Sequence, residues 1–473
     1  MSEHIRKFSK RLKGGSEMKN TTKRAYVLFA LIAAFFVGLG FMAYSFITNA
    51  DDWASSRLNE HIYKYRQLST AGTIYDRDGE VLVQTKDGTR TYSDDYETRL
   101  STLHVVGDSQ GYISTGVQNI FRSHLIGYNF VDGVYKAVKN NKGNDLKLTI
   151  DAEVSKAAYE ALGGNKGTIC AYNYQTGETV CMVSAPTYDP ENKPTDIDAD
   201  TSGKYDGIYL NRFLSGVFTP GSTFKVITSI CAIDNLPNLG KMTFNCTGKY
   251  KCGKNQYVIC NGVHGKISFE RALNVSCNSA FAYLANKLGI EKMTETAKQL
   301  GFGTSVKVSG SNTAKSYFDI SKATKLDLGW AGIGQYTTLA NPCHMLMIAG
   351  AIANSGQAII PYVVETRTSL IPTNKATVNK NISMSSETAA KMKKYLRSNV
   401  ENYYGDSRFP GLTFCGKTGS AEVEGKKSHA WFYGFSADKS FPYAIVVCLE
   451  NGGIGYNDAV PAANKVLQAI KNQ

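Results

Sequence analysis

The hydrophobic pattern of the chain begins with one long apolar segment, residues 25–48, which no charged side chain interrupts. Its length is about that of a helix that crosses a lipid bilayer. A cleaved signal peptide is the alternative, and Asn49-Ala50 leaves it open. The apolar region of such a peptide is usually shorter, however, and no clear small-x-small cleavage site precedes Asp51. The pattern therefore predicts a single transmembrane anchor.

The remainder of the chain divides into a smaller and a larger region. Residues 49–142 contain short turn-rich segments with many tyrosines and threonines and no long helical period, which predicts a β-rich stalk with little core. The polar stretch 140–144 predicts a boundary. Residues 143–473 are numerous enough for one large domain.

Strand-like and helix-like patterns alternate along the larger region. The strand-like runs are residues 146–150, 168–172, 180–184 and 443–449. The helix-like runs are residues 152–162, 224–233, 270–288, 343–354 and 462–470. The mixture predicts an α+β fold.

Charge is concentrated before the anchor. Residues 1–24 hold eight Lys/Arg against two Glu, a net charge of +6 out of +13 for the whole chain. Because basic residues stay on the cytoplasmic side of a membrane, the tail is predicted to be cytoplasmic and the larger region to lie outside. This topology accounts for much of the basic excess, so nucleic-acid binding is a poor explanation of it.

Ser222 and Lys225 form an S-x-x-K motif, which is weak alone because it recurs at 16–19 and 436–439. The context of Ser222 is special: Pro-Gly precedes it and an apolar run follows, which predicts a helix that starts at this serine. Side chains three residues apart then share one face of the first turn. A serine hydroxyl needs a base, and lysine serves as one only where its pKa is lowered.

Two further motifs, S-x-N at Ser276 and Asn278 and K-T-G from Lys417, each occur once. A capped helix boundary would explain the first if it stood alone. Thr418 and Gly419 complete the second in a glycine-rich strand end, which indicates close backbone approach or a bulge. Together the three motifs predict an acyl-transfer site with a nucleophile, a base, a polar relay and a cation.

Two rival motifs fit their surroundings less well. Residues 411–418 match the phosphate-loop pattern, but their middle is strand-like and no helical period follows. Residues 107–111 match G-x-S-x-G, again without a helix after them. The histidines form no H-E-x-x-H motif, and no G-x-G-x-x-G occurs.

With its three motifs the chain resembles a class B penicillin-binding protein, a membrane-anchored peptidoglycan D,D-transpeptidase. The resemblance covers roughly residues 72–450 and includes similar segments at 72–79, 167–192, 211–212 and 429–432. Two positions depart from the family pattern: Ala71 stands where an arginine is usual, and Tyr336 ends a G-Q-Y where the family tends to have G-Q-G.

The resemblance implies a fold and a set of roles. The fold is an antiparallel sheet flanked by helices with a mostly helical lobe. Ser222 attacks the D-Ala–D-Ala carbonyl, Lys225 accepts its proton, Ser276 relays a proton with Lys417, and Asn278 binds a substrate amide or orients the base.

Substrate binding is implied for the K-T-G strand. Thr418 and Lys417 bind the terminal carboxylate, Gly419 lies against the substrate, and the backbone N–H groups of Ser222 and Ser420 form the oxyanion hole. The implied partners are stem peptides as donor and amine acceptor, β-lactam antibiotics, the membrane and a polytopic glycan polymerase. No metal or organic cofactor is expected.

Two alternative functions remain. A D,D-carboxypeptidase or β-lactamase would use the same motifs with water as the acceptor. A catalytically silent scaffold or antibiotic sensor would keep the anchor and stalk, but the intact motifs argue against a scaffold and the short tail offers a sensor no output domain.

All ten cysteines follow the anchor. Most lie in apolar settings, as small core residues do. Cys246, Cys252 and Cys260 instead fall in a polar stretch predicted to be a loop, close to His264. Their spacing is unusual for zinc, so a Cys246–Cys260 disulfide is the interpretation we favour, with free thiols as the alternative.

Overall fold

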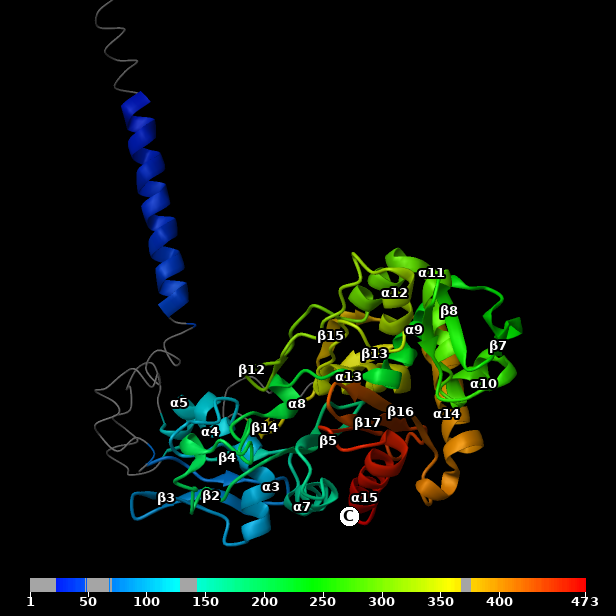
Figure 1. Cartoon of the computed structure of the whole chain (residues 1–473). Coiled ribbons are helices and arrows are strands. Elements are labelled where there is room, and N and C mark those ends of the chain that lie inside the picture. The colour runs from blue at the N-terminus through cyan, green and yellow to red at the C-terminus, as the bar shows by residue number, and fades with distance from the viewer. Residues whose placement is uncertain (1–22, 47, 49–67, 69, 128–142, 367–375) are drawn as a thin grey trace, which may run out of the picture.

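The computed structural model describes residues 23–46, 48, 68, 70–127, 143–366 and 376–473 (Figure 1). Its first element is a helix, Lys23–Phe46, with a mean hydropathy of 2.4 and none of its apolar window buried against the rest of the chain. A helix of this length and composition is consistent with the predicted single-pass anchor. Residues 1–22 of the tail predicted to be cytoplasmic, and residues 49–67 after the helix, lie outside the described residues.

One five-stranded sheet combines three strands from before residue 142 with two from the larger region, in the order β14-β4-β1-β2-β3. Its strands are β1 Ile74–Tyr75, β2 Val81–Lys86, β3 Thr89–Tyr92, β4 Leu146–Leu148 and β14 Val364–Thr366. Helices α3 Tyr96–Val106, α4 Val117–Ile120 and α5 Arg122–Leu125 accompany it. Because β4 and β14 follow residue 142, the sheet ties the expected stalk to the larger region, and the domain boundary there stays a prediction.

The second five-stranded sheet is antiparallel throughout, in the order β16-β17-β18-β5-β6. Its strands are β5 Gly167–Asn173, β6 Thr179–Ala185, β16 Phe414–Val423, β17 Lys426–Ser436 and β18 Tyr443–Leu449. Side chains alternate between two cores: Tyr172 and Trp431 belong to one, and Ala171 and Phe432 to the other. This period of two is what a strand buried on both faces requires.

Helices cover both faces of this sheet (Figure 1). Helices α7 Ala152–Ala161 and α15 Val460–Lys471 pack on one face. Helix α13 Pro342–Ala353 and the short α8 Arg212–Ser215 pack on the other. Since α13 is buried on nearly every side, its sequence is apolar all round rather than amphipathic.

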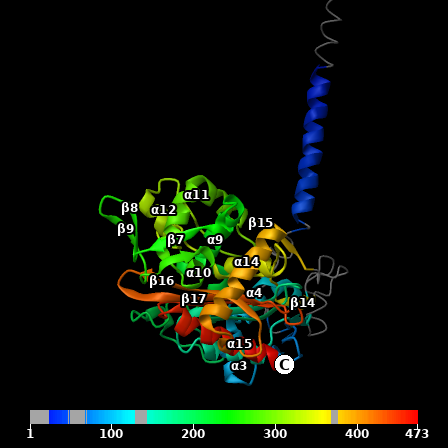
Figure 2. The same ribbon diagram turned by 90° about the vertical axis from the view of Figure 1, so that its right-hand side faces the viewer.

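A mostly helical lobe lies beyond β16 and β17 (green, with one orange helix, in Figure 2). It contains α9 Lys225–Asn235, α10 Phe269–Asn274, α11 Asn278–Gln299, α12 Lys325–Ala331 and α14 Ser386–Asn399. Its short strands are β7 Thr243–Cys246, β8 Lys249–Gly253, β9 Gln256–Ile259 and β10 Gly265–Ser268. The strands β13 Gln357–Ile359 and β15 Val378–Ser383 pair with each other beside α13. The hairpin of β11 Lys307–Val308 and β12 Ser311–Asn312 lies apart from the lobe, beside α8 (Figure 1).

Three local predictions differ from the structure. The helix does not start at Ser222, because a 3-10 turn, Gly221–Phe224, precedes α9. The predicted helix 270–288 is two helices, which break at Ser276 where φ is +54°. The polar stretch around Cys252 is also not a loop but part of paired strands, in which polar side chains alternate with buried ones.

The G-Q-Y segment supports the turn that carries Ser222. Gly334 has a φ of +78°, and its carbonyl accepts a hydrogen bond from Gly221 N–H at 2.9 Å. A Cβ at Gly334 would lie only 2.1 Å from the Gly221 carbonyl oxygen. Tyr336 has a φ of +62°, which explains why a glycine suits that position.

We therefore expect Gly334→Ala to destabilise the fold by about 2–4 kcal/mol, since the new methyl group must displace the Ser222 turn. Thermal unfolding of the purified full chain measures the effect. Gly240→Ala is the matched control, because nothing lies within 4 Å of a Cβ at that position. Equal melting temperatures for the two variants would contradict this packing argument.

Candidate active site

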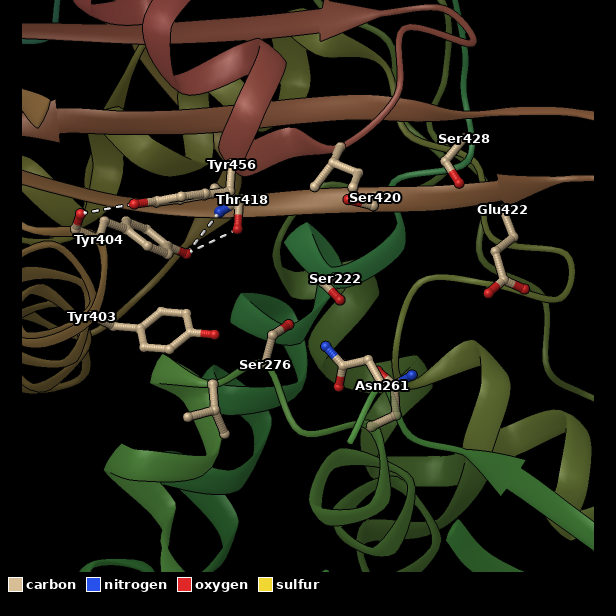
Figure 3. Close-up of a pocket in the computed structure, with 13 residues that line it drawn as sticks. Ser222, Asn261, Ser276, Tyr403, Tyr404, Thr418, Ser420, Glu422, Ser428 and Tyr456 are labelled. Carbon is tan, nitrogen blue, oxygen red and sulfur yellow. Dashed lines mark hydrogen bonds between the residues drawn. The ribbon is translucent and has the colours of Figure 1, made fainter. Parts of the chain in front are cut away.

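The three motifs, far apart in sequence, meet around one cavity of about 550 Å³. Ser222 comes from the 3-10 turn before α9, Ser276 and Asn278 from the junction of α10 and α11, and Thr418 and Ser420 from β16 (Figure 3). β16 is the edge strand of its sheet, so a ligand can lie along it. These five predicted residues line the cavity, and the predicted Lys225 and Lys417 are buried beside it, in contact with Ser276.

Glycines allow the Ser222 turn to pack against that edge. A Cβ at Gly419 would lie 2.7 Å from the Pro220 carbonyl oxygen. One at Gly221 would lie 2.9 Å from the Ser420 carbonyl oxygen, and φ there is +53°. The glycine of K-T-G is thus required by contact between two backbones.

The amine of Lys225 is buried at the centre of the site. Its Nζ lies 3.0 Å from Ser222 Oγ, 2.7 Å from Asn278 Oδ1, and 3.0 Å and 2.6 Å from the hydroxyl and carbonyl oxygens of Ser276. The side chain is completely inaccessible to solvent. Burial lowers the pKa of Lys225 to about 7, so an unprotonated amine is available near neutral pH.

Lys417 approaches the same serine from the strand. Its Nζ donates to Ser276 Oγ at 3.1 Å and to the Thr418 carbonyl oxygen at 3.0 Å. Burial, and next the nearby Lys225, lower the pKa of Lys417. Two like charges in one buried site repel each other, so protonation of one lysine disfavours protonation of the other. The Ser276 hydroxyl lies between the two amines.

Tyrosines form the part of the site that the sequence did not reveal. Tyr404 is buried, and its hydroxyl accepts a hydrogen bond from Thr418 N–H at 3.1 Å and pairs with Thr418 Oγ1 at 3.0 Å. Tyr403 and Tyr456 also line the cavity (Figure 3). Tyr403-Tyr404 follow α14 without any recognisable motif, so only the tertiary contact with β16 marks their role.

Asn261 and Glu422 line the cavity as well. Within the described residues, no carboxylate hydrogen-bonds to Ser222 or Lys225. The arrangement has the parts for nucleophilic acyl transfer: a serine, a buried amine to take its proton, and a strand edge beside them.

The cysteines differ from the favoured interpretation. All ten lie within the described residues, and all are free thiols, so the expected Cys246–Cys260 disulfide is absent. These two thiols instead gather with His264 and Cys277, and the four side chains together could hold a metal ion. Cys252 stands apart on β8.

The sequence profile of one family, described as the penicillin binding protein transpeptidase domain, matches residues 167–471. The chain belongs to this family. Its α+β fold is therefore the penicillin-binding transpeptidase fold that the motifs predicted.

Named relatives agree with this family assignment, and a solved structure agrees with the fold. A peptidoglycan D,D-transpeptidase PbpA of Mycolicibacterium smegmatis is 28% identical over 73% of this chain and 76% of its own length. A peptidoglycan D,D-transpeptidase MrdA of Acinetobacter baumannii is 27% identical over 66% of this chain, which spans about half (52%) of that relative. Penicillin-binding protein A of M. tuberculosis, in a ceftriaxone acyl-enzyme complex, has a TM-score of 0.73 at 23% identity, covering 85% of this chain and 99% of that one.

The buried amine leads to a pH-dependence prediction. Only the unprotonated form of Lys225 can accept a proton, so acylation by a fluorescent penicillin should rise with pH through a midpoint near 7. Below that midpoint the rate should fall about tenfold per pH unit. Lys225→Arg should lose acylation, because arginine stays protonated.

The control for this experiment is Lys394→Arg, the same change at an exposed position of α14, which should keep the wild-type profile. A Lys225→Arg protein that is folded by thermal unfolding and acylates at a near wild-type rate would show that this lysine is not the base.

Tyr404→Phe should weaken the binding of substrates that carry a free carboxylate. The change leaves the Thr418 N–H and hydroxyl without their partner, which costs about 1–3 kcal/mol. We expect acylation efficiency to fall roughly tenfold or more. The substrate concentration that gives half the limiting rate should rise, and the limiting rate itself should stay nearly unchanged. Tyr403→Phe is the matched control, and equal effects of the two changes would contradict the role of the Tyr404–Thr418 contact.

Proposed function

We propose that this protein is a peptidoglycan D,D-transpeptidase that cross-links stem peptides through an acyl-enzyme on Ser222. The observation that carries the proposal is the Ser222 hydroxyl 3.0 Å from a fully buried amine, Lys225, at the edge of a strand that bears K-T-G. Relatives named peptidoglycan D,D-transpeptidases support the choice of substrate.

In the first half-reaction, Ser222 Oγ attacks the carbonyl of D-Ala–D-Ala while Lys225 Nζ takes the hydroxyl proton. The oxyanion is stabilised by the backbone N–H groups of Ser222 and Ser420. When the bond to the terminal D-alanine breaks, its amine needs a proton. Ser276 lies within 3.1 Å of both lysine amines and is placed to deliver one.

The terminal carboxylate of the donor is assigned to the strand side of the site. Lys417 supplies positive charge, and Thr418 supplies a hydroxyl that the buried Tyr404 orients. Gly419 leaves room for the backbones to approach. Asn278, which contacts Lys225 at 2.7 Å, orients the base.

In the second half-reaction, the amine of a second stem peptide attacks the ester and releases Ser222. A hydrolase would need an acid that positions and activates water, as the glutamate of class A β-lactamases does. Glu422 is the acidic side chain among those lining the cavity, and it has no hydrogen bond to the serine or the lysine. This favours an amine over water as the acceptor.

We infer that helix Lys23–Phe46 anchors the enzyme in a membrane and that the reaction takes place near the membrane surface. The net charge of +6 before helix Lys23–Phe46 favours a cytoplasmic tail and an extracytoplasmic catalytic region. Cross-linking requires glycan strands to be made nearby, and the family resemblance suggests a polytopic glycan polymerase as the membrane partner. Inhibition by β-lactams follows from the same acyl-serine chemistry.

Partition of the acyl group between amine and water tests the proposal. With a thioester or stem-peptide donor, added D-amino acid should capture the acyl group ahead of water, and product ratios should follow its concentration. A penicilloyl adduct should map to Ser222 and persist for roughly hours. Glu422 has no hydrogen bond to Ser222 or Lys225 through which it could activate water, and each ~1.4 kcal/mol left in the barrier slows hydrolysis tenfold.

Time-resolved intact-mass analysis with peptide mapping measures both properties. Ser222→Ala should lose the adduct, whereas Ser436→Ala, in the other S-x-x-K match of the folded region, should keep it. Turnover of the adduct within seconds, or product ratios that ignore the acceptor, would favour a hydrolase.

A further inference from the structure

The hairpin of β8 and β9 presents an exposed basic face beside the catalytic cavity. The two strands pair Lys249 with Ile259 and Lys251 with Tyr257, so these four side chains share one side of the hairpin. Both lysines and Ile259 are exposed, and the Lys249 ammonium lies 4.5 Å from the centre of the Tyr257 ring. The opposite side, with buried Val258, packs on α11 and α12. The four outward side chains form the basic face.

The charge of this part of the lobe has one sign. Residues 241–269 contain five lysines and no Asp or Glu. Among the residues that the structure describes, neither Lys249 nor Lys251 forms an ion pair with a carboxylate. A group of cations without acidic partners attracts an anionic ligand, and the aromatic ring holds one of the ammonium groups in place.

The basic face leads into the cavity. The ladder continues past the end of β9, because Cys260 N–H donates to the Gly248 carbonyl at 2.9 Å. The next residue, Asn261, is exposed again and lines the cavity. Asn278 fixes this end of the strand, since its Nδ2 donates to the Ile259 carbonyl at 3.0 Å. A chain seated on β16 can therefore continue onto the β8–β9 hairpin, which projects to the same side as the β16–β17 hairpin (Figure 2).

The direction of the donor decides which part of it reaches this face, and here the argument rests on the proposed function. The terminal carboxylate of the donor is assigned to Thr418. Figure 3 places Thr418 on one side of Ser222 and Glu422 on the other. The rest of the donor stem therefore leaves the cavity past Glu422 and Asn261, toward the basic face.

A peptidoglycan stem peptide has a matching order of charges. Before D-Ala–D-Ala it carries a diamino acid with a side-chain amine, and before that a γ-linked glutamate with a free α-carboxylate. Since an extended chain covers about 3.5 Å per residue, the glutamate lies roughly 7 Å from the acylated D-alanine. A strand rises about 3.4 Å per residue, so Ile259 and its partner Lys249 lie roughly 7 Å from Asn261. An acid at the rim of the cavity and cations beyond it thus follow the order of the substrate.

We propose that the basic face binds the acidic part of the donor stem peptide, with Lys249 and Lys251 receiving the glutamate carboxylate. This contact favours donors whose glutamate carboxylate is free over donors in which it is amidated. A penicillin has no group that corresponds to the glutamate, so its reaction with Ser222 does not need the basic face.

Competition with a fluorescent penicillin measures donor binding to the full chain, purified in detergent. The probes are two soluble stem pentapeptides, one with the glutamate carboxylate free and one with it amidated. In wild type, the acidic pentapeptide should slow acylation at a roughly tenfold lower concentration than the amidated one. Lys249→Gln/Lys251→Gln should remove most of this preference, and Lys249→Glu/Lys251→Glu should reverse it, since two acids then repel the glutamate.

The matched control is Lys86→Glu/Lys380→Glu, the same change of charge at two exposed strand lysines outside the lobe. It should keep the wild-type preference, which separates the basic face from the overall charge of the chain. Without competitor, penicillin should acylate all of these variants at the wild-type rate. Raised salt should narrow the preference in wild type, because the contacts are exposed.

Equal competition by the two pentapeptides in wild type, or a preference that survives charge reversal, would overturn the proposal. Loss of inorganic polyphosphate binding on charge reversal, with the pentapeptide preference unchanged, would also overturn it and assign the face to an anionic polymer. Release of D-alanine tests the proposed function separately. The expected preference in a chain that releases D-alanine from neither pentapeptide would support the basic face and count against the proposed transpeptidase.

Discussion

The buried amine of Lys225 is the interaction on which the site depends. Its four oxygen neighbours belong to Ser222, Ser276 and Asn278, and thus to two segments more than fifty residues apart. An amine without water must find such partners or lose its proton, and here both happen: the contacts satisfy it while burial lowers its pKa to about 7. Burial of Lys225 among these residues therefore also lowers its pKa enough for the amine to act as a base.

The S-x-N turn depends on surrounding contacts to maintain its backbone conformation. Ser276 adopts a left-handed conformation between two helices and must still place its oxygens against Lys225 and Lys417. On its front the two amines hold it. On its back, Cys277 packs against the thiols of Cys246 and Cys260 and the imidazole of His264. A strained turn held from both sides keeps a defined geometry.

Much of this could be predicted from local sequence. Charge-free length predicts the membrane helix, alternating patterns predict α+β, and three spaced motifs predict the site. The errors were local conformations that depend on neighbours. Ser222 lies in a 3-10 turn because Gly334 and the β16 edge constrain it. The stretch around Cys252 pairs as strands, and the expected Cys246–Cys260 disulfide is absent.

By itself, the sequence determined the chemical inventory: a serine with a lysine three residues on, a relay, a strand with K-T-G and an apolar anchor. Each of these follows from residue identity at short spacing, where backbone geometry leaves few choices. Only the tertiary structure decided that Tyr404 hydrogen-bonds to Thr418, that burial lowers the pKa of Lys225, and that the thiols of Cys277 and Cys246 lie close together. Those features are contacts between segments distant in the chain, and no local pattern encodes a distance that exists only after folding.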